Sequence, residues 1–156
     1  MSAFGGLLAP RWRDDARAAL VGLTLAHDRR HVSRAVLEGV AFQAVEVLDA
    51  MVEDTGRGLG ALRVDGGVAQ SDVMLQIQAD LAAVPVERPA DVETTAAGAA
   101  VAAGLGCGVF DSVSDVAAGT EPPATFSPKL PAADRDAKLA SWRAAVDATY
   151  GWADRA

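Results

Sequence analysis

The chain reads RVDGGVAQSD from Arg63 to Asp72, where a short strand is joined to a helix through two adjacent glycines. Gly66 and Gly67 carry no Cβ, so the backbone there can adopt positive φ and can approach another molecule closely. Ser71 is a preferred helix N-cap, and Asp72 places a negative charge at the positive end of the helix. The free N–H groups of such a helix start suit a polar or anionic ligand. The run predicts a strand, turn and helix open to a ligand, although a plain tight turn gives the same pattern.

Extended and helical patterns alternate on both sides of this unit. Residues 18–23, AALVGL, form a short apolar run typical of a strand, and residues 85–88 predict another extended piece. Asp28 is placed to cap a long helix that ends at the glycines of residues 56–60. Apolar residues recur on this helix at the spacing of one helix face: Val32, Val36, Val40, Val47 and Met51.

The pattern continues to the end of the chain. Helices are expected from Ser71 to about residue 82, from Thr94 or Thr95 to about Gly106, and over residues 113–118 and 132–152. The proline-rich residues 120–131 predict a surface loop. Strands that alternate with helices indicate an α/β fold in which helices flank a sheet. A length of 156 residues allows one domain or a piece of one.

Composition narrows the classes of partner. The formal net charge is −7 and no Lys/Arg-rich run is present, which argues against nucleic acid and against anionic lipid. The uncharged residues 94–110 are mostly Ala, Gly and Thr, so we expect a packed helix there and no membrane span. Cys107 is the only cysteine, and the N-terminus lacks the apolar core of a signal peptide. Both features favour a cytoplasmic protein.

Three motifs occur in an order and spacing that resemble the FGGY family of carbohydrate kinases. AALVGL at residues 18–23 is followed by HVSRAVLE at residues 31–38, VDGG follows at residues 64–67, and ETTAAGAA at residues 93–100. FGGLLAPRWRDDAR, residues 4–17, is similar to a segment of the glycerol kinase branch of that family. Arg11 departs from this pattern, in which an aromatic residue is usual. A xylulose kinase or another sugar kinase of the family is therefore an alternative.

The resemblance implies two actin-like, RNase H-like α/β domains around a cleft that holds ATP and Mg²⁺. Residues 1–156 would be part of the C-terminal, nucleotide-side domain, truncated at the N-terminus, and the N-terminal substrate domain would be absent. Gly66, Gly67 and Ser71 would bind the nucleotide, with Ser71 where the family often has Asn. Thr95 and Gly98 would help the next helix to pack closely.

The resemblance also implies an activity for the full-length form, the phosphorylation of glycerol to glycerol 3-phosphate by ATP. The catalytic carboxylate and a phosphate-binding hairpin would lie upstream of the matching region. We therefore expect no catalytic residue and no metal ligand in this chain, and no turnover by the chain alone. A non-catalytic module that binds nucleotide or a partner protein is the alternative. Exposed strand edges and apolar surface would favour self-association, including a homo-oligomer.

Several residues have side chains that could act in catalysis or metal binding, but each has a structural interpretation. Asp65 is expected to fix its turn by accepting from nearby N–H groups, in preference to binding Mg²⁺. Glu38 is expected to make a structural hydrogen bond. His27 and His31 have no partners at metal-ligand spacing. Cys107 is interpreted as a small buried residue, in line with the usual burial of this residue type.

Overall fold

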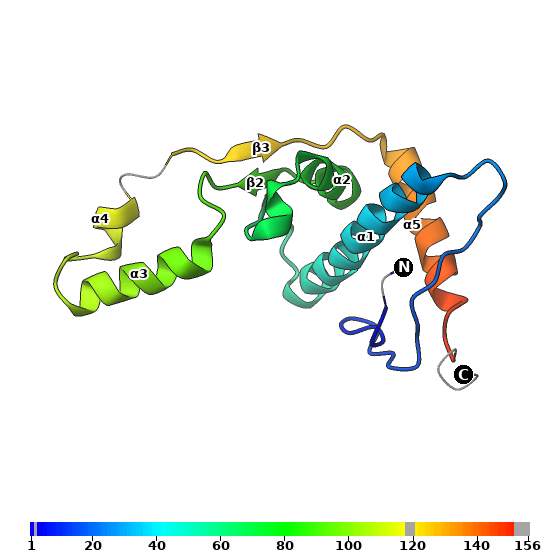
Figure 1. Cartoon of the computed structure of the whole chain (residues 1–156), viewed down its shortest axis with the longest axis horizontal. Coiled ribbons are helices and arrows are strands. Elements are labelled where there is room, and N and C mark those ends of the chain that lie inside the picture. The colour runs from blue at the N-terminus through cyan, green and yellow to red at the C-terminus, as the bar shows by residue number, and fades with distance from the viewer. Residues whose placement is uncertain (2, 118–120, 152–156) are drawn as a thin grey trace.

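The computed structural model describes residues 1, 3–117 and 121–151, and Figure 1 shows their arrangement. The long helix α1 (Arg29–Thr55) is followed by strand β1 (Leu62–Arg63), the 3-10 helix η1 (Gly67–Gln70) and helix α2 (Asp72–Ala82). Strand β2 (Val86–Arg88), helices α3 (Thr94–Gly106) and α4 (Val113–Ala117), strand β3 (Ala124–Phe126) and helix α5 (Ala132–Asp147) complete the order. Connections of one to six residues join these elements, as in other compact α/β units.

The three strands form one mixed sheet in the order β1-β2-β3. β1 and β2 run parallel, with Leu62 opposite Val86, while β3 runs antiparallel to β2, with Phe126 opposite Val86. Helix α2 lies in the connection between the parallel strands and packs against both η1 and β2. The α/β class expected from the sequence, a sheet with flanking helices, is confirmed.

The main core lies where α1, α2 and α5 meet. Phe42 of α1 stacks on Trp142 of α5 with ring centroids 5.1 Å apart, and Ile77, Leu81 and Val146 are buried around them. A second cluster, which includes Leu75, Ala79 and Val86, lies between α2 and the sheet. Because α2 contributes to both clusters, it holds the sheet against the helices.

Helix caps explain where α1 and α2 begin. The carboxylate of Asp28 accepts hydrogen bonds from the N–H groups of Arg30 and His31, which forms the capping box of α1. Ser71 caps α2 by accepting from the N–H of Met74 at 3.3 Å. Gly56, in the left-handed conformation, ends α1. These boundaries match the expectations from sequence.

Residues 18–23 do not form the expected strand. Among these residues only Ala19 is paired with another segment. Its N–H donates to the C=O of Met1, and its C=O accepts from the Met1 amino group. The side chains of Leu20, Val21 and Leu23 are all more than half exposed. A strand requires a paired neighbour along its length, and the described residues supply a single pair here.

Two further boundaries differ from expectation. The segment interpreted as a loop, residues 120–131, contains β3. The three residues of this strand lie between prolines and have the backbone N–H groups that pairing with β2 requires. The last helix ends at Asp147, and Thr149 turns back to donate its hydroxyl to the C=O of Val146. The predicted end at residue 152 lies outside the described residues.

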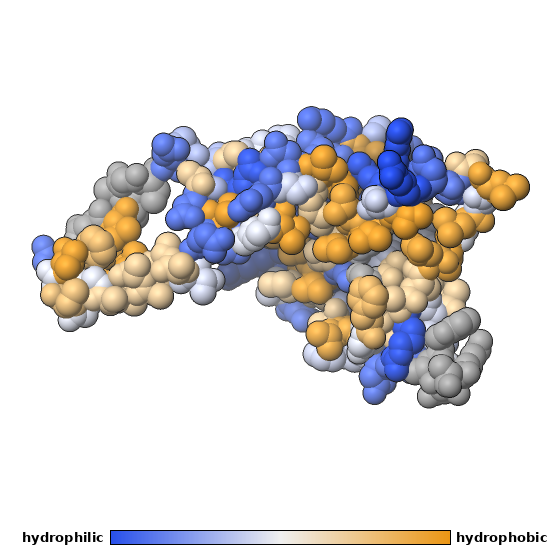
Figure 2. Space-filling view, in the orientation of Figure 1, coloured by the Kyte–Doolittle hydropathy of each residue, from blue (hydrophilic) through white to orange (hydrophobic). Residues whose placement is uncertain are grey.

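Helix α1 is apolar on two faces, and only one of them is covered. Ala41, Phe42 and Val45 are buried against the core. The face that the sequence spacing marks out is exposed, with exposed fractions between 36% and 57% at Val36, Val40, Val47 and Met51. Figure 2 shows broad hydrophobic areas on the body of the molecule among charged ones. Apolar side chains on two opposite faces are typical of a helix packed between two layers.

Helices α3 and α4 extend away from the body of the molecule (Figure 1). The connection between them folds back on α3, where the Phe110 ring covers Gly104 so closely that a Cβ at Gly104 would lie 2.5 Å from that ring. Thr95 and Gly98 are exposed, and a Cβ at Gly98 would meet nothing within 4 Å. The expected close packing at these two residues is therefore wrong for the described residues. Within that part of the chain, no helix is long and apolar enough to cross a membrane.

Candidate functional site

The glycine turn connects β1 to η1. Gly66 has φ +79°, a left-handed backbone that disfavours other residues, and its N–H donates to the C=O of Val92 at 2.8 Å. Its C=O then accepts from the N–H of Ala69 at 3.0 Å and starts η1. Gly66 therefore shapes the turn and ties it to the segment before α3.

Gly67 has no such role within the chain. Its φ lies outside the left-handed region, and a Cβ placed on it would meet no atom within 4 Å. Neither conformation nor crowding in the described residues requires glycine at this position. Its bare backbone and exposed surface are therefore accessible to an external molecule.

Ser71 follows η1 and belongs to the same turn. Its Oγ is committed as an acceptor to the N–H of Met74, but the hydroxyl hydrogen remains available as a donor. Asp72 adds a carboxylate to the first turn of α2. The structure thus brings Gly66, Gly67 and Ser71 together at the carboxyl end of β1.

Arg88 holds this turn in place, a role that the sequence did not indicate. From β2 its guanidinium donates to the C=O groups of Ala69 at 3.1 Å and Gln70 at 3.4 Å, and to Asp72 at 2.8 Å. It also lies over the Phe126 ring, 5.4 Å from the ring centroid. The only available sequence signal was a basic residue at the end of an extended piece.

An open cavity of about 440 Å³ lies beside the turn, at the ends of β1 and β2. Its lining includes Asp65, Glu87, Thr94 and Glu121, but not Gly66, Gly67 or Ser71. Its volume falls within the range of small-molecule sites. Asp65 accepts a hydrogen bond from the Thr94 hydroxyl, so it ties the turn to the start of α3 and not to nearby N–H groups as expected.

The remaining candidates have structural partners or are exposed. Glu38 bonds Arg34 at 2.9 Å and Lys138 at 3.2 Å, as its structural interpretation predicted. His31 bonds Asp28 within the cap of α1. Cys107 is exposed, so the prediction of a buried thiol is wrong, because it follows a helix that extends away from the core. Within residues 1, 3–117 and 121–151, no three His, Cys, Asp or Glu side chains gather as a metal site.

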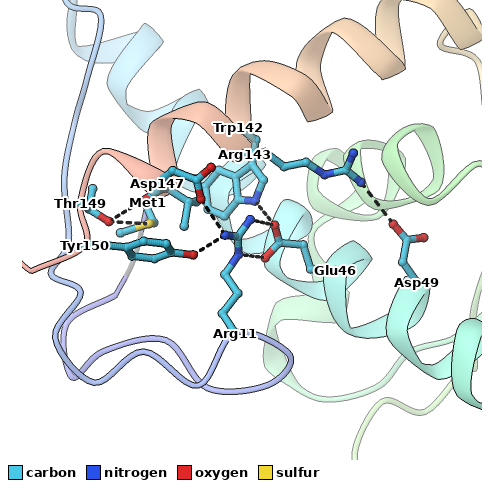
Figure 3. A network of polar contacts seen from close by, with 10 residues as sticks. Met1, Arg11, Glu46, Asp49, Trp142, Arg143, Asp147, Thr149 and Tyr150 are labelled. Carbon is cyan, nitrogen blue, oxygen red and sulfur yellow. Dashed lines mark hydrogen bonds and ion pairs between the residues drawn. The ribbon is translucent and has the colours of Figure 1, made fainter.

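Arg11 forms the centre of a polar network that joins the N-terminal loop to α1 and α5 (Figure 3). Its guanidinium donates twice to Glu46, at 2.9 and 2.6 Å, and also to Tyr150 and Asp147. Trp142 donates its ring N–H to the same Glu46 carboxylate at 2.9 Å. The hydrogen bonds with Glu46 raise the pKa of Arg11 above its ordinary range. Arg11, which departs from the family pattern, is thus a structural residue here.

A parallel strand pair that ends in a glycine turn, a capped helix and an open cavity make this an α/β domain with a candidate ligand site at the strand ends. The sequence comparison specifies the family. Residues 1–107 match the C-terminal domain of the FGGY family of carbohydrate kinases, and the chain belongs to that family.

Individual relatives agree with this assignment. The chain is 47% identical over 150 residues to the glycerol kinase of Corynebacterium kroppenstedtii, covering 96% of this chain and 29% of the relative. It is 47% identical over 152 residues to the glycerol kinase of Leifsonia xyli, covering 97% of this chain and 30% of the relative. The chain therefore spans about 30% of the length of these relatives.

Two solved structures resemble the fold. A structure of Plasmodium falciparum glycerol kinase with ADP superimposes with a TM-score of 0.82 at 39% identity, covering 95% of this chain and 30% of that one. A ligand-bound xylulose kinase from Lactobacillus acidophilus gives 0.70 at 25% identity, covering 95% and 31%. Both likenesses extend over nearly all of this chain.

Proposed function

We propose that this chain is the C-terminal, nucleotide-side portion of a glycerol kinase, which in its full-length form phosphorylates glycerol to glycerol 3-phosphate with ATP and Mg²⁺. The observation that carries this proposal is Gly67, where neither conformation nor crowding among the described residues explains the lack of a side chain, and where a Cβ would face open space. The similarity to glycerol kinases over nearly all of the chain supports the same substrate class.

The chemistry of the turn suits a nucleoside. A base or ribose can lie against the backbone of Gly67, where no Cβ keeps it away, while the Ser71 hydroxyl can donate to it. The neighbouring cavity offers the carboxylates of Asp65, Glu87 and Glu121, which accept hydrogen bonds from hydroxyl or amino groups. Arg63 also lines the cavity and pairs with Glu87 at 3.1 Å, but carboxylates remain in excess and repel phosphates, so we assign the nucleoside end of ATP to this region.

Mg²⁺ in kinases is usually held by one or two carboxylates together with the substrate phosphates, and we place those phosphates outside this cavity. We therefore assign the metal, the phosphates and the catalytic base to the rest of the full-length enzyme, including a substrate-side domain. The task of this chain is to fix the nucleoside so that the terminal phosphate reaches the substrate hydroxyl. Such positioning supplies much of the catalysis in phosphoryl transfer.

Another sugar kinase of the family is the second candidate. The likeness to xylulose kinase favours it, as does Arg11, which stands where the glycerol kinase pattern has an aromatic residue. The higher identity and TM-score with glycerol kinases make glycerol the first choice. A module that binds nucleotide or protein without catalysis is the remaining alternative.

Reconstitution tests the proposal. The chain is mixed with the part of the Corynebacterium kroppenstedtii glycerol kinase that precedes the matched region, and ADP formation is measured with glycerol or xylulose. We expect ADP formation that requires both polypeptides and glycerol. Activity with xylulose alone would move the assignment to the second candidate. A folded complex that forms no ADP with either substrate would contradict the kinase proposal.

A further inference from the structure

The segment that connects β2 to α3 holds the start of the glycine turn. The N–H of Gly66 donates to the C=O of Val92 at 2.8 Å. One residue earlier in the turn, the carboxylate of Asp65 accepts a hydrogen bond from the Thr94 hydroxyl. Both partners lie at the first residue of α3 or just before it. The position of the first half of the turn is therefore set by this segment as well as by β1.

Arg88, the last residue of β2, holds the second half of the turn. Its Nη1 donates to the C=O groups of Ala69 and Gln70, the last two residues of η1, and to the carboxylate of Asp72. The guanidinium is itself held in place, because it lies over the Phe126 ring and its side chain is only 23% exposed. One side chain therefore orients the two peptide planes that lead into the cap of α2.

The middle of the turn lies between these two held ends. Gly67 and Val68 are both exposed, Val68 to 65%. The N–H of Ala69 donates to the C=O of Gly66 at 3.0 Å and so links the two ends across the middle. The result is a closed turn whose ends are fixed by the residues that flank one neighbouring segment, and whose centre is accessible to a ligand.

We propose that Arg88 is a positioning residue for the nucleotide, which sets the affinity of the turn without touching the ligand. The inference rests on the proposed function, because it requires a nucleoside to lie against Gly67. Arg88 is not among the described residues that line the neighbouring cavity. A ligand that meets a turn already in its bound shape loses no binding free energy to ordering that turn. Without the guanidinium, the C=O of Ala69, a residue only 2% exposed, loses this donor, so we expect the second half of the turn to rearrange.

Arg135 offers a matched control at the opposite end of α2. Its side chain is also 23% exposed. It also donates to a backbone C=O, that of Leu81 at 2.8 Å, and to an aspartate, Asp136. Arg135→Met therefore removes a comparable set of contacts, including one to the same helix, without reaching the turn. An effect of Arg88→Met that arises from lost stability alone should appear in both variants.

The first measurement is made without nucleotide. Amide hydrogen exchange is followed by NMR at Ala69 and Ser71, whose N–H groups donate within the turn. We expect Arg88→Met to speed exchange at both residues more than about fivefold relative to Gly66, which is held from the other side. Arg135→Met should leave this ratio unchanged. Equal acceleration in the two variants, or none in Arg88→Met, would overturn the proposal.

The second measurement is an ADP titration of the same proteins, followed at the amide of Gly67. We expect Kd to rise at least about fivefold in Arg88→Met and to stay within about twofold of the parent in Arg135→Met. Kd should rise less in Arg88→Lys, because its ammonium retains N–H donors for part of the contact. An unchanged Kd in Arg88→Met, or an equal rise in Arg135→Met, would overturn this inference alone. Absence of saturable shifts in the parent would instead overturn the proposed function, and the inference with it.

Discussion

Arg11 connects three segments that are far apart in the sequence. The Arg11 side chain is 17% exposed and the Glu46 side chain 10%, and a two-point contact joins them. Removal of the guanidinium would leave the largely buried Glu46 carboxylate with Trp142 as its remaining donor among the described residues. An ionised group that loses its partner in such surroundings costs more than the pair itself contributes.

We predict that Arg11→Met lowers the free energy of unfolding by about 2 kcal/mol. Urea denaturation followed by circular dichroism measures the change. Arg63→Met is the matched control, because Arg63 also pairs with a glutamate but is 88% exposed. It should change stability by less than about 0.5 kcal/mol. Equal losses in the two variants would show that Arg11 has no special structural role.

Elements that depend on neighbouring residues were predictable, and elements that depend on distant ones were not. Asp28 and Ser71 act within their own first helical turns, so their sequence signals identified α1 and α2 correctly. Residues 18–23 and β3 depend on whether another strand lies beside them, which composition does not reveal. Within the candidate site, the glycine turn could be predicted. The hydrogen bonds from Arg88 to the turn could not, because they join residues at least 16 positions apart and no sequence motif marks them.

The cap of α1 makes a pH-dependent contribution. Hydrogen bonding to the His31 side chain, followed by bonds from backbone N–H groups, lowers the pKa of Asp28 below its ordinary value of 3.8. A carboxylate with a lowered pKa in the folded state stabilises the protein above the unfolded-state pKa. That stability is lost as pH falls through the folded-state value.

We therefore predict that the chain loses stability as pH falls below about 4, and that Asp28→Asn loses less over this window. Asparagine keeps an N-cap acceptor but does not titrate, so the variant should be less stable than the parent at neutral pH and should approach it as the carboxylate is protonated. Urea midpoints measured between neutral and acidic pH test the difference. Identical pH profiles for parent and variant would exclude Asp28 as a contributor.

The molecule exposes many large apolar side chains that are not part of its core. The outer stripe of α1, the segment 18–21 and the loop at residues 4–12 all present large apolar side chains to solvent. Helix α3 adds an uncharged surface away from the body. Surfaces of this extent are typical of interfaces, and in isolation they favour association.

We predict that the isolated chain self-associates with increasing concentration, as light scattering would show. The double variant Val40→Lys/Met51→Lys should reduce the associated fraction severalfold, because it places two charges on the α1 stripe. Val109→Lys is the control, since Val109 is 70% exposed but lies beyond α3. A parent chain that stays monomeric at high concentration would contradict this prediction.

The central claim is that the glycine turn contacts a nucleoside, and an ADP titration followed by amide NMR tests it most directly. We predict weak but saturable shifts centred on Gly66, Gly67 and Ser71. Gly67→Ala should remove them without loss of stability, since a Cβ there meets no neighbour. Shifts that avoid this turn, or that persist unchanged in Gly67→Ala, would contradict the claim.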